Sequence, residues 1–209
     1  MIELNKIIHA DCMDIMKDIP DNYFELCLTD PPYGCNVAYN SYEDSQENLV
    51  NLINKFEPEI KRISKFAMIT PGNANIKHYK LFDYMFILYQ PASMAIGHYG
   101  STNWQPILIY GKEVLKKFSE KWTLLRNTEP APKLNHPCPK PLQVWKKMLL
   151  RGSAMEGDKV FDPFSGSGTT AIACIDLNRN YLCIEKDNDY YEASQKRIDK
   201  ENIKLKLAI

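Results

Sequence analysis

A short, stiff turn that carries a carboxylate and a phenol follows an apolar run early in the chain. Residues 24–29 (FELCLT) have the pattern of a buried strand, and Asp30, Pro31, Pro32 and Tyr33 come directly after them. Each proline fixes φ and lacks a backbone donor, so the turn is rigid and leaves carbonyl oxygens that no neighbouring amide claims. Asp30 and the Pro31 carbonyl are acceptors beside the flat ring of Tyr33, a set that suits a planar group bearing an NH2. An ordinary turn of this composition is an equally good interpretation of the stretch alone.

A glycine-rich turn is the second stretch with chemical meaning. It falls within residues 160–173 (VFDPFSGSGTTAIA), where Gly166, Gly168 and Ala171 fit the pattern G-x-G-x-x-A. Glu185 lies 19 residues after Gly166, at the end of the next predicted strand. Strand, glycine turn, helix, strand and acid in this order are typical of nucleotide binding, because glycines let a ligand approach the backbone and the acid accepts from ribose hydroxyls. A tight strand-to-helix turn without a ligand is the alternative.

Two classes of ligand fit this second turn. A dinucleotide would place its pyrophosphate at the N-terminus of the helix. S-adenosylmethionine has a ribose but no phosphate, and its methionine end carries an ammonium and a carboxylate. Asp162 ends the strand before the glycines. A carboxylate there suits an ammonium better than a pyrophosphate, which favours S-adenosylmethionine without excluding the dinucleotide.

The elements that position these turns alternate between strands and helices. Apolar runs predict strands at 24–29, 65–70, 84–89, 104–111, 158–162 and 180–185, and spacing at helical period predicts helices at 46–64, 140–150, 169–177 and 188–206. This alternation predicts an α/β fold with a mostly parallel sheet and helices on both faces. The runs 84–89 and 104–111 look like a late pair of strands, and Pro106 suggests that the second is an edge strand or contains a bulge. Residues 112–139 show no clear period.

The composition limits the class of protein. The 209 residues are expected to form one domain, and Lys plus Arg equals Asp plus Glu at 26 each, which argues against a strongly basic coat for nucleic acid but not against a local basic groove. The six cysteines form no C-x-x-C pair and no zinc-ligand spacing, so we expect reduced thiols and no metal. With no signal-peptide pattern and no apolar run long enough for a membrane span, we expect a soluble intracellular protein.

Taken together, TDPPYG and FDPFSGSGTT resemble the amino-group DNA methyltransferases, which methylate the exocyclic amine of adenine or cytosine. The Asp30 motif precedes the glycine motif, the order of the β-class circular permutation. HADCMDIMKDIPDNYFELCLTDPPYG, WQPILIYGK and HPCPKPLQVWKKML resemble further stretches of that family, so the resemblance extends over nearly the whole chain except 112–133. It implies a Rossmann-like methyltransferase fold whose mostly parallel sheet has a late antiparallel hairpin. It also implies S-adenosylmethionine as cofactor, DNA as partner, and a cytoplasmic protein of bacterial or phage origin.

The resemblance also implies a mechanism at the first motif. An aromatic exocyclic amine is a poor nucleophile because its lone pair is delocalised into the ring. Asp30 and the Pro31 carbonyl would accept its hydrogens, and Tyr33 would stack on a base that has left the duplex. The catalytic set is therefore Asp30, Pro31, Pro32 and Tyr33, with direct transfer of the methyl group from sulfur to nitrogen.

The cofactor set implied by the family spans the chain. Asp11 and Cys12 are expected near the adenine of the cofactor, Glu185 on its ribose, and Lys140, with His136 and Pro137 nearby, at its methionine carboxylate. The remaining members are Asp30, Asp162, Phe164, Gly166, Ser167, Gly168 and Thr169. A solvated charge is the alternative role for Lys140. Cys138 follows a proline, like the nucleophile of cytosine carbon-5 methyltransferases, but it falls inside HPCPKP, so we interpret it as structural.

Target recognition is where the chain departs from the family. The segment 112–135 is short for reading the major groove. Trp122 could stack on a base, and phosphate contacts are expected from Lys112, Lys116, Lys117, Lys121 and Arg126. The loop after Tyr33, GCNVAYNSYED, would close over the flipped base or be a plain surface loop. A homodimer or a partner subunit that supplies recognition also remains open.

The leading hypothesis is methylation of adenine N6 in DNA, because Asp at the first motif position usually goes with adenine in this family and Ser with cytosine. The alternatives are methylation of cytosine N4, of RNA or of a protein amide, and a subunit that binds without catalysis. A dinucleotide-dependent oxidoreductase is a more distant alternative for the function.

Overall fold

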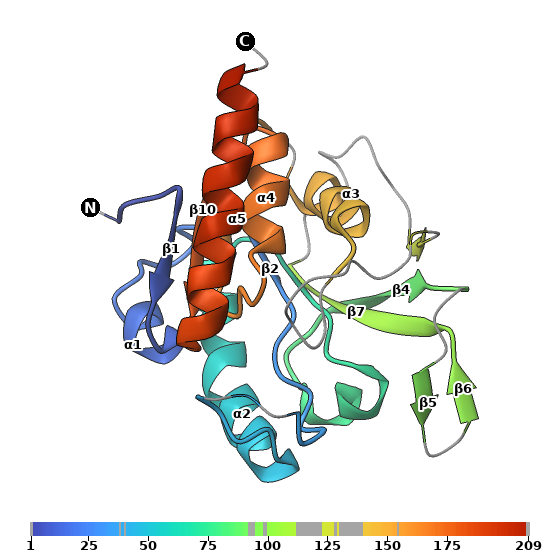
Figure 1. The fold of residues 1–209 in the computed structure, drawn as a ribbon. Helices are drawn as coiled ribbons and strands as arrows, with labels where there is room; N and C mark the ends of the chain where they lie inside the picture. Colours follow the sequence, from blue (N-terminus) through green and yellow to red (C-terminus); the bar gives the residue numbers. More distant parts are fainter. Residues whose placement is uncertain are drawn as a thin grey trace.

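The computed structural model describes residues 2–37, 39, 41–91, 95–97, 100–111, 123–127, 129, 140–153 and 155–207. Within them, one sheet has eight strands (Figure 1). In spatial order these are β1 (Lys6–His9), β10 (Asn180–Glu185), β9 (Lys159–Asp162), β2 (Leu26–Thr29), β3 (Ala67–Ile69), β7 (Trp104–Tyr110), β4 (Tyr84–Tyr89) and β8 (Leu124–Arg126). The first five run parallel, and β7 runs antiparallel to β3 and β4. A separate two-stranded ribbon consists of β5 (Ala95–Gly97) and β6 (Gly100–Thr102).

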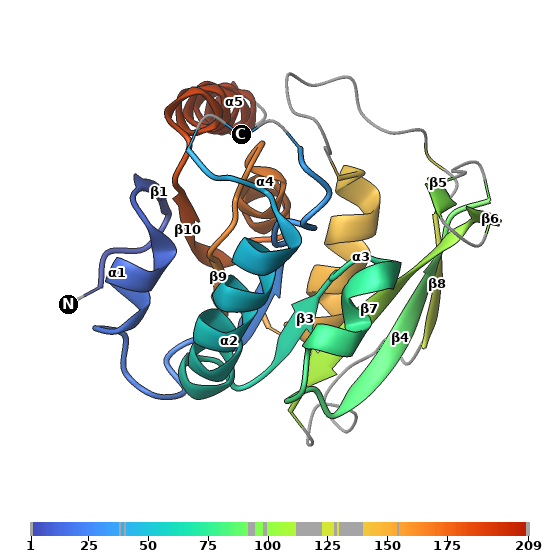
Figure 2. The ribbon, with the colours of Figure 1, turned by 90° about the horizontal axis from the view of Figure 1, so that it is seen from below.

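Helices cover both faces of the sheet. In Figure 2, α3 (Leu142–Gly152), α4 (Thr169–Asp176) and α5 (Asn188–Leu207) lie on one face, and α1 (Cys12–Met16), α2 (Gln46–Ile63) and the 3-10 helix η1 (Asn73–His78) lie on the other. Each face has its own apolar core. In β2, Leu26 and Leu28 join the core under α3 and α4, whereas Cys27 joins the core under α2, as the alternation of side chains along a strand requires. The predicted three-layer α/β fold with a mostly parallel sheet is confirmed.

Neighbouring parallel strands bring the two predicted turns together. Strand β2, which ends before Asp30, pairs with β9, which ends at Asp162, and β9 pairs with β10, which ends at Glu185. Parallel strands present their carboxyl ends at one edge of a sheet, where open α/β folds bind ligands. The sheet therefore places the Asp30 turn beside the glycine turn, although more than a hundred residues separate them in the chain.

The expectation for Pro106 was wrong. Strand β7 is neither an edge strand nor bulged at this residue, because it lies between β3 and β4 and Pro106 pairs in register with Ile87. The Ile87 amide donates to the Thr123 carbonyl on the side of β8, so this pair exchanges no hydrogen bond between β4 and β7. On its other side β7 pairs with β3 only as far as Leu108. A proline is tolerated here because neither neighbour needs its missing amide.

Several elements were not predicted from the sequence. They are β1, α1, η1, the β5–β6 ribbon and β8, and each has six residues or fewer. The predicted pair 84–89 and 104–111 is confirmed as β4 and β7. Among the described helices, none has both the length and the apolar content needed to cross a bilayer.

Candidate active site

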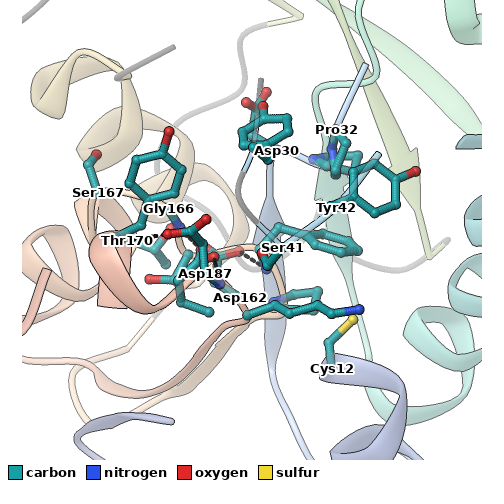
Figure 3. Close-up of a pocket in the computed structure, with 18 of the residues that line it drawn as sticks. Cys12, Asp30, Pro32, Ser41, Tyr42, Asp162, Gly166, Ser167, Thr170 and Asp187 are labelled. Atoms are coloured by element: carbon teal, nitrogen blue, oxygen red, sulfur yellow. Dashed lines mark hydrogen bonds between the residues drawn. The ribbon is translucent and has the colours of Figure 1, made fainter. Parts of the chain in front are cut away.

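A cavity opens at the carboxyl ends of β2, β9 and β10 (Figure 3). Its wall contains most of the predicted site residues, with Asp30 and Pro32 toward one side of the view, Asp162 and Thr170 in the middle, and Cys12 toward the opposite side. The predicted members in the wall are Asp11, Cys12, Asp30, Pro31, Pro32, Tyr33, Lys140, Asp162, Phe164, Gly166, Ser167, Thr169 and Glu185. Both motifs therefore face one space.

The Asp30 carboxylate is held through both of its oxygens. The hydroxyl of Tyr33 donates to Oδ1 at 2.5 Å, and the hydroxyl of Thr70 donates to the same oxygen. Lys140 places its ammonium 2.7 Å from Oδ2 and also donates to the Tyr33 hydroxyl at 2.8 Å. The side chains of Lys140 and Asp30 are only 15% and 16% exposed, so solvent screens this ion pair less than a surface pair. The sequence placed Lys140 at the cofactor, whereas in this structure its partner is Asp30.

The backbone around Tyr33 is fixed by polar side chains from outside the turn. Asp44, which is 2% exposed, accepts from the amides of Gly34 at 2.6 Å, Cys35 at 2.9 Å and Val37 at 3.1 Å. The amide group of Asn75 donates to the Tyr33 carbonyl at 2.8 Å. The start of the loop that follows Tyr33 is thus anchored at its base.

Asp162 is buried at the end of β9 and satisfied by neutral donors. Its Oδ1 accepts from the Thr29 hydroxyl at 2.6 Å and the Phe164 amide at 3.1 Å, and its Oδ2 accepts from the Thr170 hydroxyl. Trp145 donates in turn to Thr170 at 2.9 Å. Burial raises the pKa of Asp162 to about 6, and these hydrogen bonds oppose the rise.

The glycine turn and Glu185 are joined by hydrogen bonds. The Gly166 amide donates to Oε2 of Glu185 at 2.6 Å, and the Asp187 amide donates to Oε1 at 2.8 Å. Burial raises the pKa of Glu185 above its ordinary value. The Gly166 amide donates to Glu185 and the Gly168 amide donates to the Ser165 carbonyl, so neither amide is available to a phosphate.

Gly168 packs against α5. It belongs to the expected cofactor set, but it is not among the residues that line the cavity. A Cβ at this position would meet the Cβ of Ser194 on α5 at 3.0 Å. Its φ of +76° also favours glycine at the start of α4. Gly168 therefore serves the packing of α4 against α5.

Asp11 and Cys12 lie where β1 passes into α1. Asp11 accepts from the Met13 amide at 3.0 Å, which caps α1, and forms an ion pair with Lys186 at 2.9 Å. The Cys12 thiol is 5% exposed, and burial, with Asp11 beside it, raises its pKa to about 12. A thiol of this kind stays protonated and supplies an apolar surface rather than a nucleophile.

Other predicted residues fall elsewhere. Arg126 is exposed on β8, at the end of the sheet, and does not line the cavity. His136, Pro137, Cys138, Lys112, Lys116, Lys117, Lys121 and Trp122 lie outside the described residues. Among the residues that are described, no cluster of histidine, cysteine and carboxylate side chains is arranged to hold a metal ion.

Sequence reasoning missed some residues of the site. Thr70 directly follows β3 and Thr29 is the last residue of β2, so a polar residue at the end of an apolar run was the available signal. Tyr39 and Tyr190 line the cavity from the loop and from α5, with their rings edge to face at 6.3 Å. Trp145 also lines the cavity, from α3. No spacing in the sequence relates these aromatic residues.

The described lining is acidic overall. It contains two lysines, Lys140 and Lys186, and five carboxylates, namely Asp11, Asp30, Asp162, Glu185 and Asp187. Both lysines are already paired with members of this set. Such a cavity attracts cations and repels polyanions.

Solved structures show which class of fold this is. TTHA0409 of Thermus thermophilus, determined with S-adenosyl-L-methionine, superposes with a TM-score of 0.68 at 21% identity, covering 94% of this chain and 93% of that one. The PvuII cytosine-N4-specific DNA methyltransferase superposes with a TM-score of 0.70 at 17% identity, covering 92% and 85%. The chain therefore has the Rossmann-like α/β fold of DNA methyltransferases.

Sequence comparisons find similarity to DNA methylases. A family model described as DNA methylase, of the N6/N4 type, matches residues 98–196. The type II methyltransferase M.HpaI of Haemophilus parainfluenzae is 23% identical, covering 94% of this chain and 74% of the relative. The DNA adenine methyltransferase YhdJ of Escherichia coli K12 is 26% identical, covering 94% and 83%. M2.MboI of Moraxella bovis is 45% identical over 62 residues, or 30% of this chain and 22% of that relative. The chain is thus similar to DNA methylases of the N4/N6 type.

Proposed function

We propose that this protein transfers a methyl group from S-adenosylmethionine to the N6 amine of adenine in DNA, on a base turned out of the duplex. The observation that carries the proposal is that the Asp30 turn and the Gly166–Glu185 turn line one cavity. An amine bound at Asp30 and a nucleoside bound at Glu185 would meet there.

The lining fits S-adenosylmethionine better than a dinucleotide. This cofactor supplies a methyl group on a sulfonium and carries a net positive charge, which suits five carboxylates against two lysines. A pyrophosphate would meet the same carboxylates, and the amides of Gly166 and Gly168 already have partners within the chain. Glu185 has further lone pairs for ribose hydroxyls, and Asp162 would attract the ammonium of the methionine end.

Asp30 would do the chemical work on the base. Its carboxylate and the Pro31 carbonyl would accept the hydrogens of the amine, so that the nitrogen becomes pyramidal and its lone pair becomes available. Asp30 is also the base that would take the proton that the amine loses on methylation. Tyr33, which donates to Asp30 and packs beside Gly72, would offer its ring to the base. Rigid placement of these groups is the main contribution to catalysis.

The base is proposed to be adenine because a carboxylate stands at the first position of the motif. Among the relatives, YhdJ is named as an adenine methyltransferase, and the PvuII enzyme, which shares the fold, is named as specific for cytosine N4. Cytosine N4 is therefore the second candidate. The residues Lys112, Lys116, Lys117, Lys121 and Arg126 are proposed to contact DNA phosphates, with a second subunit adding recognition if one binds.

One experiment tests the reaction and the base together. The protein is incubated with S-adenosylmethionine and mixed-sequence DNA, and the digested nucleosides are measured by mass spectrometry. Formation of N6-methyldeoxyadenosine supports the proposal. Formation of N4-methyldeoxycytidine would mean that the target base is cytosine instead of adenine. If neither product forms with DNA, while the protein binds S-adenosylmethionine, then DNA is the wrong substrate.

A further inference from the structure

The ion pair between Lys140 and Asp30 conflicts with the reaction proposed above, on which this inference rests. Lys140 lies 2.7 Å from Oδ2 of Asp30, and Oδ1 already accepts from Tyr33 and Thr70. The amine of the base gains positive charge as the methyl group reaches it. An ammonium on the same carboxylate would oppose that charge, and the low exposure of both side chains makes the repulsion stronger. Lys140 must therefore leave Oδ2 before methyl transfer.

The other carboxylates in the described part of the cavity wall already have partners within the chain, so no unpartnered carboxylate is waiting there for Lys140. Asp11 is paired with Lys186, Asp162 is satisfied by Thr29, Thr170 and the Phe164 amide, and Glu185 accepts from two amides. Asp187 lies beside Glu185, where it accepts from the amides of Asp189 and Tyr190. A new partner for Lys140 has to arrive with a ligand.

S-adenosylmethionine brings one carboxylate, and chain geometry places it near Lys140. The sulfonium must face Asp30, because the methyl group passes from the sulfur of the cofactor to the amine that Asp30 holds. Only a short carbon chain joins the sulfur to the carboxylate, so this group lies at the same end of the cavity. Lys186 is next to Glu185, at the ribose end.

We propose that Lys140 exchanges partners, leaving Asp30 for the carboxylate of the cofactor when the cofactor binds. Asp30 then becomes available to the amine of the base only in the presence of cofactor. Lys140 is thus a positioning residue that makes the cofactor bind productively before the base. It protects the empty enzyme from holding a flipped base that it cannot methylate.

Calorimetry with S-adenosylhomocysteine, which has the carboxylate but no methyl group to transfer, tests the exchange. Four proteins are compared, namely wild type, Asp30→Asn, Lys140→Met and the double variant. Asp30→Asn removes the competing partner, so it should tighten binding by roughly three- to tenfold, whereas Lys140→Met should weaken binding by roughly tenfold or more. In the Lys140→Met background, Asp30→Asn should change the affinity less than about twofold. Methylthioadenosine, which lacks the amino-acid end, should bind all four proteins alike.

Three results would overturn the exchange. They are weaker binding in Asp30→Asn, an undiminished effect of Asp30→Asn in the Lys140→Met background, and unchanged affinity in Lys140→Met. Lys140→Gln is measured in parallel, so that poor folding of one variant does not decide the result, and circular dichroism checks each protein. If wild type binds neither S-adenosylhomocysteine nor S-adenosylmethionine, the proposed function itself fails, and the exchange fails with it.

Discussion

The two ends of the cavity hold their carboxylates in different ways. At one end, Asp162 and Glu185 are fixed by neutral donors, namely backbone amides and threonine hydroxyls. At the other end, Asp30 is held by a lysine 110 positions away in the chain, by the hydroxyl of Tyr33 in its own turn and by the hydroxyl of Thr70. Amides and buried hydroxyls cannot move far, but a lysine on a long stem can. The end proposed for the cofactor is therefore preorganised, and the end proposed for chemistry is adjustable.

The largest effect should come from Asp30 itself. Asp30→Ala removes the acceptor for the amine and should lower the rate of methylation by about a thousandfold or more. Binding of S-adenosylhomocysteine should remain, and should tighten as in Asp30→Asn, because the fixed end of the cavity is intact and Lys140 loses its competing partner. Methyl incorporation into DNA and calorimetry measure the two properties on the same sample. Turnover near that of wild type would remove Asp30 from the catalytic role.

Asp162 makes the fixed end sensitive to pH. Burial raises its pKa from 3.8 to about 6, so the folded protein holds this proton more tightly than the unfolded chain does. The protonated Asp162 carboxyl therefore contributes to the free energy of unfolding in full below pH 3.8. This contribution, about 3 kcal/mol, is lost as the pH rises through about 6. The difference in unfolding free energy between wild type and Asp162→Asn, measured by urea denaturation over this range, should follow that course. Asp18→Asn, at an exposed carboxyl, is the control and should track wild type.

Glu185 tests whether the fixed end binds the nucleoside. Glu185→Gln keeps the shape and one acceptor oxygen, but it loses the negative charge and replaces the second acceptor oxygen by an NH2 group. We expect roughly tenfold weaker binding of S-adenosylhomocysteine and of methylthioadenosine alike, because both contain the ribose. Glu192→Gln, at an exposed position of α5, should leave both affinities unchanged. A loss confined to S-adenosylhomocysteine would move Glu185 away from the ribose.

Substitution of Thr70 should give the smallest effect on catalysis, and it tests how the hydroxyl donors hold Asp30 at the adjustable end of the cavity. Thr70→Val keeps the shape but removes the hydroxyl that donates to Asp30. We expect kcat to fall several-fold to tenfold with little change in the KM for S-adenosylmethionine, because Asp30 loses one of its orienting donors. Thr70→Ser restores the hydroxyl and should recover most of kcat. Equal losses in Thr70→Ser and Thr70→Val would mean that only the packing of the side chain matters.

Much of the fold could be predicted because its longer elements repeat a simple pattern. The helix at 46–64 was predicted from apolar residues at helical spacing, and it is α2. The strands at 84–89 and 104–111 were predicted as a pair, and they are β4 and β7. The four residues of β1 have no comparable pattern, and three-residue β8 lies in a stretch without a period. Short elements depend on pairing with strands that are distant in sequence, and local pattern does not contain that information.

The sequence by itself determined the chemical groups of the site and the local shape that holds them. Two prolines after Asp30 restrict φ and stiffen that turn, whereas glycines after Asp162 permit the positive φ values that the second turn uses, and both effects are local. The fold alone decided which groups face one another. Lys140 meets Asp30, Thr70 meets the same carboxylate and Asp44 holds the loop after Tyr33, because adjacent strand ends and the loops beyond them converge at one edge of the sheet. An ion pair between residues 30 and 140 depends on the full set of strand neighbours, and no spacing along the chain encodes it.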